Sequence, residues 1–341
     1  MAAMKEIEIA GGGLAGLSLG IALRKHGVPV LIREAGNYPR HRVCGEFING
    51  VTRDTLARLG IDGIFSDALE HHATRWWMGN RRILEAKLTR PALGMSRWEM
   101  DERLRLEFVQ SGGELSVRDR ARPEARDGLV WTAGRYLEKS SNLLGLKAHF
   151  EGLALDGYLE MHIGDGAYVG LTPVAADGSR VNVCGLFRKG ASVKGESPLV
   201  TALKRCGLGQ LAGRLSKAKM DEASLTGISG FALGQQGGDD GMLTLGDSER
   251  MIPPFTGNGM SMAFESAECA LNPLIAYAEG KASWPEIREE VRNSLNKRFS
   301  KRVRLALALQ RCLTMSAGRA VLSAASVSGV LPFAWLHRKL C

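Results

Sequence analysis

The sequence lacks the features that would place it in an oxidising compartment or across a membrane. Its six cysteines form no Cys-x-x-Cys pair, and no run reaches the ~20 uninterrupted apolar residues of a transmembrane helix. The apolar stretch near the start is expected to be the first strand of the fold, so we expect no secretory segment. A cytoplasmic protein in a reducing environment is therefore predicted.

Acidic residues are absent from the last part of the chain. From Lys297 to Cys341 there are nine Lys and Arg and no Asp or Glu, so this stretch carries +9, which equals the formal net charge of the whole chain. The apolar segment Ala320–Leu336 lies within it and is interrupted by Gly329 and Pro332. Two interpretations remain open: a basic amphipathic region that contacts the inner face of an anionic membrane or covers a lipid-like substrate, and a helical pair with a solvated basic face packed on the domain that begins the chain. Nucleic acid is not expected as a partner, because no recognition motif accompanies the charge.

The chain does contain many glycines, 42 in 341 residues, with 45% apolar residues, a composition that suits an α/β fold with tight turns. The first glycine-rich turn lies between Lys5–Ala10, which alternates like a short strand, and Leu14–Lys25, which has apolar residues at helical spacing. Val28–Arg33 then predicts a second parallel strand, and Glu34 follows it.

This strand, turn, helix and strand predict a dinucleotide-binding unit. Gly11 permits the tight turn, Gly13 allows the backbone to approach a pyrophosphate, and Gly16 allows close packing of helix and strand. Glu34 is placed to accept hydrogen bonds from ribose hydroxyls. Both NAD and FAD carry such a ribose, so this motif alone leaves the two cofactors open.

A second motif near the end of the chain favours FAD. Met242–Leu245 predicts a buried strand that ends at Gly246 and Asp247, and Pro253–Gly259 leads into a helical stretch, Met260–Tyr277. Asp247 would accept a hydrogen bond from a ribityl hydroxyl, and the positive end of the helix would face the pyrimidine edge of a flavin.

Together these residues resemble the superfamily of FAD-dependent aromatic hydroxylases, flavin-dependent halogenases and geranylgeranyl reductases. Pro39–Phe47 is similar to the loop of geranylgeranyl reductases in which a Cys-Gly pair lies close to the flavin, and Gly94–Leu104 resembles the segment whose Arg binds FAD. The resemblance places Ala15, Glu34, Cys44, Gly45, Phe47, Arg97, Asp247, Gly259 and Met260 at cofactor contacts, in addition to Gly11, Gly13, Gly16 and Gly257 of the two glycine motifs.

The sequence departs from this superfamily in three places. The Asp-Gly motif associated with NAD(P)H binding in many hydroxylases is replaced by Thr132-Ala133-Gly134-Arg135, so NAD(P)H and a reductase partner both stay open as electron donors. The Phe-Pro-Lys ending typical of geranylgeranyl reductases is absent from Tyr168–Val174, and the Trp-x-Trp-x-Ile-Pro motif of tryptophan halogenases is absent throughout. Halogenation of that type is therefore not expected.

The resemblance implies a fold like that of p-hydroxybenzoate hydroxylase: a Rossmann-like α/β domain for FAD with an inserted substrate domain on a mixed or antiparallel sheet. We predict that residues 1–63, 94–141 and 236–285 form the FAD domain, 64–93 and 142–235 the substrate domain, and 286–341 a basic, apolar helical region. The strand-like runs Leu144–Phe150 and Arg180–Leu186 would belong to a sheet over the flavin.

Catalytic residues are not identified by any pattern. Tyr168 and His162 are weak candidates, for orienting or protonating a substrate and for acid-base chemistry, and for both a structural role in a strand is favoured over a catalytic one. No metal site is predicted. The favoured function is a flavin monooxygenase acting on a hydrophobic small molecule; a reductase of alkene C=C bonds and a non-catalytic flavin-binding or electron-transfer component are the alternatives.

Overall fold

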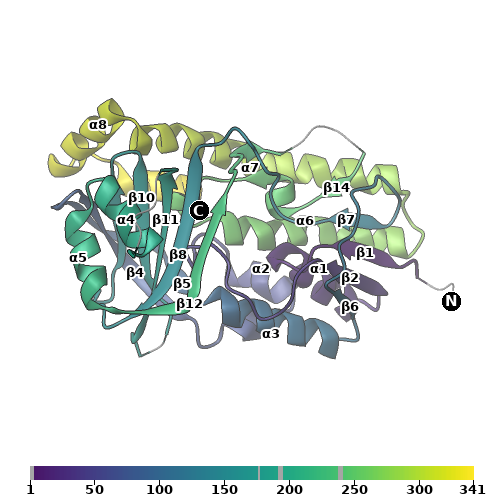
Figure 1. The fold of residues 1–341 in the computed structure, drawn as a ribbon. Coiled ribbons are helices and arrows are strands. Elements are labelled where there is room, and N and C mark those ends of the chain that lie inside the picture. The colour runs from purple at the N-terminus through teal and green to yellow at the C-terminus, as the bar shows by residue number, and fades with distance from the viewer. Residues whose placement is uncertain (1–3, 176, 191–194, 237–240) are drawn as a thin grey trace.

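The computed structural model describes residues 4–175, 177–190, 195–236 and 241–341. The Gly- and Asp-rich stretch Gln235–Gly241, whose composition predicts a loop, lies largely outside them. The described chain contains two large sheets (Figure 1). The smaller is parallel and has the order β14 (Leu243–Thr244), β7 (Leu129–Trp131), β1 (Ile7–Ala10), β2 (Val30–Glu34) and β6 (Glu114–Val117).

The helices of the parallel-sheet half are close-packed. They are α1 (Leu14–Lys25), α2 (Arg53–Arg58), α3 (Arg97–Gln110) and α6 (Gly259–Ala278). A Cβ added at Gly20 of α1 would lie 2.8 Å from the ring of Phe108 on α3 and 2.9 Å from Ile32 on β2. Only glycine allows this approach of helix to strand. Helix α1 forms over the residues that its apolar spacing indicated.

The larger sheet has eight strands in the order β12 (Lys219–Ser229), β8 (Leu143–Glu151), β11 (Arg180–Arg188), β10 (Ala167–Pro173), β9 (Leu159–Gly164), β4 (Leu69–Met78), β5 (Arg81–Gly94) and β3 (Phe47–Ile48). Its pairs are antiparallel except β4 and β9, which are parallel. This mixed sheet confirms the predicted architecture. A third, two-stranded sheet joins β13 (Gly234–Gln235) to β15 (Arg250–Met251).

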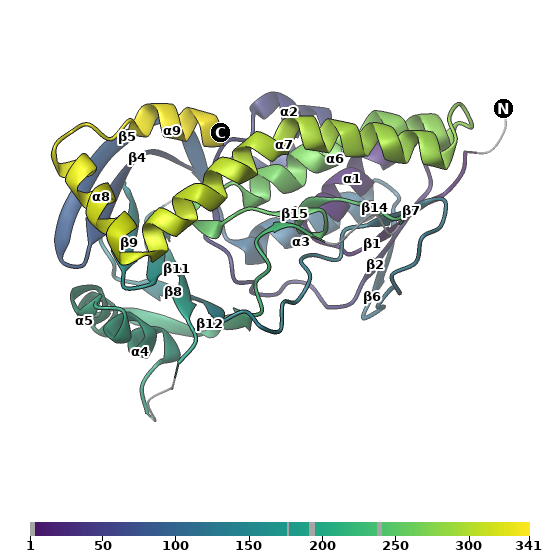
Figure 2. The same cartoon turned by 90° about the horizontal axis from the view of Figure 1, so that it is seen from above.

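Helices cover the larger sheet on two sides (Figure 2). On one side α4 (Pro198–Arg205) and α5 (Gly209–Lys217) share an apolar core with β8, β10 and β11. On the other lie α7 (Trp284–Thr314), α8 (Ser316–Val327) and α9 (Phe333–Leu340). Short 3-10 turns occur at Asp62–Phe65, Gly246–Ser248 and Pro254–Thr256.

The basic C-terminal region forms three helices where the helical interpretation expected a pair. Helix α7 starts with a capping box in which Ser283 and Glu286 satisfy each other's backbone groups, and it packs along α6. Gly329 and Pro332 separate α8 from α9, as their sequence positions indicated. Both short helices lie against β5 of the larger sheet, away from the parallel sheet. Among the described residues, no helix combines the length and apolarity needed to cross a bilayer.

Candidate functional site

The glycine-rich turn between β1 and α1 has the backbone geometry that its sequence indicated. Gly11 has a φ of +111°, and a Cβ there would lie 2.5 Å from the carbonyl oxygen of Thr132. A Cβ at Gly16 would lie 2.1 Å from the Gly11 oxygen. At Gly13, the N-cap of α1, a Cβ would meet no atom within 4 Å. The turn is therefore compact around Gly11 and Gly16 and open at Gly13.

Glu34 lies at the end of β2 and faces this turn. Its almost fully buried carboxylate accepts hydrogen bonds from the Gly12 amide at 2.9 Å and the Gly36 amide at 2.7 Å, and it pairs with Arg40 at 2.8 Å. The Tyr38 hydroxyl donates to the Gly12 carbonyl, and burial raises the pKa of this tyrosine. Hydrogen bonds thus join the Glu34 carboxylate to the glycine turn at the carboxyl edge of the parallel sheet.

The second glycine motif reaches the same edge. A Cβ at Gly246 would lie 3.2 Å from the methyl group of Ala15, so the turn after β14 touches the first turn of α1. Asp247 follows, half-buried, and accepts no hydrogen bond from any described residue. Desolvation raises the pKa of Asp247 to about 6, although the charges of Arg97 and Arg135 oppose the rise.

The Cys-Gly loop and the start of α6 complete the site. The Cys44 Sγ lies 3.6 Å from the sulfur of Met260, and burial raises the pKa of the Cys44 thiol against the nearby charge of Arg97. The Phe47 ring covers Gly257 so closely that a Cβ there would lie 2.0 Å from it. A Cβ at Gly259, the first residue of α6, would meet nothing within 4 Å.

Arg97 is held in a fixed position beside this loop. Its guanidinium donates to the fully buried Asp101 at 2.7 and 3.0 Å, and Arg42 pairs with the same carboxylate at 2.7 Å. The structure therefore brings the thirteen predicted cofactor positions to the carboxyl edge of the parallel sheet and the loops that adjoin it. In open α/β sheets this edge is where ligands bind.

A buried charged cluster lies directly behind the Cys-Gly loop, and no sequence pattern indicated it. Glu46, which has a positive φ of 55°, accepts from the Arg97 amide at 3.1 Å, approaches Lys147 at 3.3 Å and contacts the His149 Nε2 at 2.6 Å. Lys147 Nζ lies 3.2 Å from His41 Nδ1, and burial lowers the pKa of His41 to about 4. The residues come from one loop and β8, a hundred positions apart, so no local pattern could have joined them.

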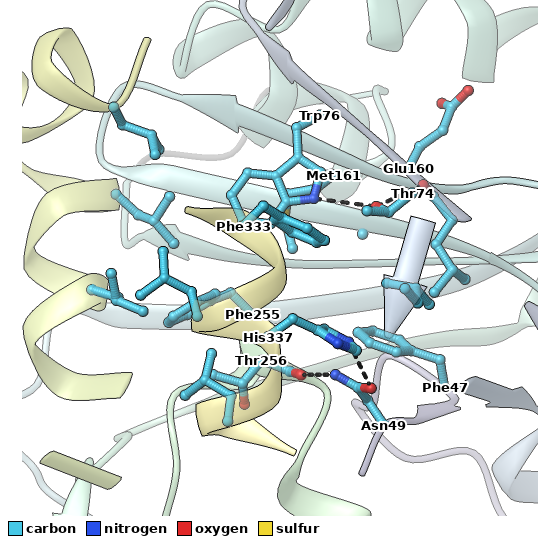
Figure 3. A pocket seen from close by; sticks show the side chains of 18 of the residues that line it. Phe47, Asn49, Thr74, Trp76, Glu160, Met161, Phe255, Thr256, Phe333 and His337 are labelled. Atoms are coloured by element: carbon cyan, nitrogen blue, oxygen red, sulfur yellow. Dashed lines mark hydrogen bonds between the residues drawn. The ribbon is translucent and has the colours of Figure 1, made fainter. Parts of the chain in front are cut away.

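An apolar cavity of roughly 120 Å³ adjoins the other side of the Cys-Gly loop (Figure 3). Phe47, Phe255 and Thr256 belong both to its wall and to the loops of the proposed cofactor site. The larger sheet supplies a second wall with Trp76 and Met161, and α7 to α9 close the third. Its polar groups are few and mostly paired, as in Trp76 Nε1 donating to Thr74 at 3.2 Å.

A series of hydrogen bonds joins the cavity to the loop that precedes α6. The Thr89 backbone amide donates to His337 Nδ1 at 3.3 Å, so the ring proton resides on Nε2, which donates to Asn49 Oδ1 at 3.1 Å. Asn49 Nδ2 in turn donates to the Thr256 carbonyl at 3.2 Å (Figure 3). Helix α9 is thereby connected to the Pro-Phe-Thr-Gly loop, a link that the sequence did not reveal.

The two weak catalytic candidates do not line this cavity. His162 is buried between Glu160, 2.9 Å away, and the parallel ring of Trp77. Tyr168 is buried edge-on to Phe255, and burial raises the pKa of its hydroxyl. Within the described ranges, no group of three or more His, Cys, Asp or Glu side chains could hold a metal ion.

The two-sheet fold is similar to the folds of solved FAD-dependent monooxygenases, flavin-dependent halogenases and a geranylgeranyl-reductase-like protein. No family model and no curated protein matches the chain.

Three solved structures illustrate the likeness. The p-nitrophenol 4-monooxygenase PnpA of Pseudomonas putida is 16% identical, with 100% of this chain and 97% of that one covered and a TM-score of 0.75. PqsL of P. aeruginosa, in complex with 2-aminobenzoylacetate, is 15% identical over 93% and 99%, with a TM-score of 0.73. A geranylgeranyl bacteriochlorophyll reductase-like protein of Thermoplasma acidophilum is 17% identical over 96% and 91%, with a TM-score of 0.72. Similarity at this level establishes the fold.

Proposed function

We propose that the protein is an FAD-dependent oxidoreductase, and that it acts as a monooxygenase on a hydrophobic small molecule. The observation that carries the proposal is the meeting of two glycine motifs, more than two hundred residues apart, at one sheet edge beside an apolar cavity. The open positions at Gly13 and Gly259 fit an extended dinucleotide, and so does the carboxylate of Asp247, which accepts no hydrogen bond within the described part of the chain.

Each part of the site has a task in this proposal. Glu34 would accept from the adenosine ribose and Gly13 would let the backbone amides approach the pyrophosphate. Asp247 would accept from the ribityl chain, while the first amides of α6 would face the electron-poor ring edge. Bound FAD would supply the redox chemistry; the residues of this chain bind it, orient it and exclude water.

The cavity supports a hydrophobic substrate. Its walls are mainly Leu, Phe, Trp and Met side chains, and it reaches the proposed flavin site through Phe47 and Phe255. Such a cavity binds an aromatic, polyketide or lipid-like molecule by apolar contact and keeps water from the reacting centre. The fixed polar groups at its edge, Asn49 and His337, orient the Thr256 loop.

Cofactor binding is tested by filling the open glycine position. Gly13→Val adds a side chain where the structure has free space, so we expect the protein to fold but its FAD affinity to fall by about tenfold or more. The matched control is Gly213→Val, at an exposed position of α5 where an added Cβ is equally free of contacts. This variant should keep full FAD affinity. Equal affinity in both variants, measured by fluorescence titration with FAD, would remove the proposed site.

Monooxygenase and reductase chemistry are distinguished by the product. The reduced holoprotein is mixed with isotopically labelled oxygen and 1-naphthol, and separately with geranylgeraniol under argon. Label in a hydroxylated naphthol supports the monooxygenase. A saturated prenyl chain without oxygen uptake would instead support the alkene reductase, the second candidate, which the likeness of the Cys-Gly loop to that of geranylgeranyl reductases favours. The electron donor is identified by whether NADPH alone bleaches the yellow protein or a reductase is required.

A further inference from the structure

Helix α9 has two faces of opposite character. Phe333, Leu336, His337 and Leu340 follow helical spacing and line the apolar cavity. The opposite face presents Ala334, Trp335, Arg338 and Lys339 to solvent, and Trp335 is 50% exposed. Lys339 lies over the Trp335 ring at 6.0 Å. An exposed tryptophan flanked by two cations is the pattern of a helix that lies in a lipid interface.

Helix α8 and the turn after it extend this outward face. The solvent side of α8 carries Ala317, Ala320, Val321, Ala324 and Val327 and no charged residue, and Val321 is 69% exposed. In the turn, Val330 is 71% exposed. We call the exposed side chains of residues 317–339 the α8–α9 face. Both views place α8 at the end of the molecule opposite the N-terminus (Figures 1 and 2).

The charge around the α8–α9 face has one sign. Arg311, Arg338 and Lys339 are exposed, and no acidic residue occurs from position 297 onward in the sequence. Arg319 is occupied by an ion pair with Asp165 at 2.8 Å, so it is not counted here. Apolar side chains surrounded by exposed cations are complementary to an anionic lipid surface, whose headgroups attract the cations while the apolar side chains enter the interface.

We propose that the α8–α9 face docks the protein on an anionic lipid bilayer. The inner sides of the same two helices, through Leu322 and Phe333, form a wall of the apolar cavity together with Leu331 of the turn between them. A lipid-soluble substrate would therefore pass from the bilayer to the cavity along helices that contact both. This last step rests on the proposed function, whereas docking itself does not.

The test is co-sedimentation with vesicles made of equal parts phosphatidylserine and phosphatidylcholine, compared with vesicles of phosphatidylcholine alone. We expect the unmodified protein to bind the mixed vesicles and added salt to weaken this binding. The double variants Val330→Ser/Trp335→Ser and Arg338→Gln/Lys339→Gln should each bind about tenfold more weakly. Binding is measured with and without FAD, so a failure to bind FAD does not affect the result. Circular dichroism confirms that each variant is folded.

Two matched controls remove similar groups elsewhere. Lys301→Gln/Arg304→Gln deletes two exposed cations of α7, and Val109→Ser/Val117→Ser deletes two exposed apolar side chains near the parallel sheet. Both controls should bind vesicles like the unmodified protein. Equal losses in the controls, or no binding to the mixed vesicles, would overturn the proposal. A dimer of the unmodified protein in sedimentation equilibrium, if the Val330→Ser/Trp335→Ser variant no longer forms it, would also overturn the proposal. In that case a second copy of the chain covers the face.

Discussion

At the scale of single residues, we expect the fold to be sensitive to mutation of the buried pair Glu46 and Lys147. Both side chains are fully buried. Lys147→Met removes the only lysine that pairs with Glu46 among the described residues, and we expect a loss of about 3 kcal/mol in the free energy of unfolding. Urea unfolding measures this loss.

The double variant Glu46→Gln/Lys147→Met is the control for that experiment. It removes both charges, so it should recover a large part of the stability that Lys147→Met loses. If the double variant is less stable than the single one, the cost arises from packing and not from an uncompensated buried charge.

Asp247 makes the second prediction at this scale, because its pKa is raised in the fold to about 6. Its neutral form is favoured by folding, so its contribution to stability is full below the unfolded value of about 3.9 and is lost as the pH rises through about 6. Asp247→Asn should therefore raise the melting temperature of the FAD-free protein at neutral pH and leave it unchanged at acidic pH. A stabilisation that does not vary with pH would contradict the assignment.

Residues within one motif were easier to predict than residues joined by folding. The compact turn at Gly11 and Gly16 and the open position at Gly13 followed from strand, turn and helix spacing because all three are local. The Glu46 cluster and the Asn49 to His337 link were missed because each joins segments a hundred or more residues apart. Their side chains have ordinary hydrophobic or polar neighbours in the sequence, so only the tertiary fold brings them together.

At the scale of elements, α9 is attached through a histidine that has to stay neutral. Burial, with a smaller contribution from Arg90, lowers the pKa of His337, and its Nδ1 accepts from Thr89. The stability that this group contributes is present above its ordinary value of about 6.5 and is lost as the pH falls through the lower value in the fold. Below about pH 6 we therefore expect faster amide exchange across Phe333–Leu340, after correction for intrinsic rates.

His337→Gln separates this effect from the other histidines. Glutamine does not titrate, so the exchange rate of α9 in the variant should have lost its dependence on pH, although the helix is held less tightly throughout. If acid loosens α9 equally in both proteins, another titrating group is responsible.

Helices and strands were predicted correctly where the apolar pattern in the sequence was long. The prediction was poorer where pairing between strands determined their bounds. Helix α1 and strands β8 and β11 were predicted within a few residues because their apolar patterns run for several turns or pairs. Strand β14 is shorter than Met242–Leu245, since only Leu243 and Thr244 pair with β7. Strand β3 joins the larger sheet through Phe47 and Ile48, a pairing with β5 that no local pattern indicates.

At the scale of the whole molecule, the proposed cofactor site joins segments from the beginning, the middle and the end of the chain. A ligand that binds all of them stabilises the entire fold. With free FAD at a hundredfold excess over its Kd, we expect the free energy of unfolding to rise by about 2.7 kcal/mol. FMN, which lacks the adenosine that Glu34 and Gly13 would contact, should give a smaller rise, and Gly13→Val should abolish the difference between the two.

The three-helix wall of the cavity also bears on how such a protein diversifies. Helices α8 and α9 meet the larger sheet through side chains, whereas the cofactor turns are fixed by glycine backbones that admit no substitution at Gly11 or Gly16. Mutations can therefore accumulate in one wall while the proposed cofactor site stays constant. For laboratory evolution of substrate range, a library confined to Leu322, Leu331, Phe333 and Leu336 would reshape the cavity without passing through cofactor-free intermediates.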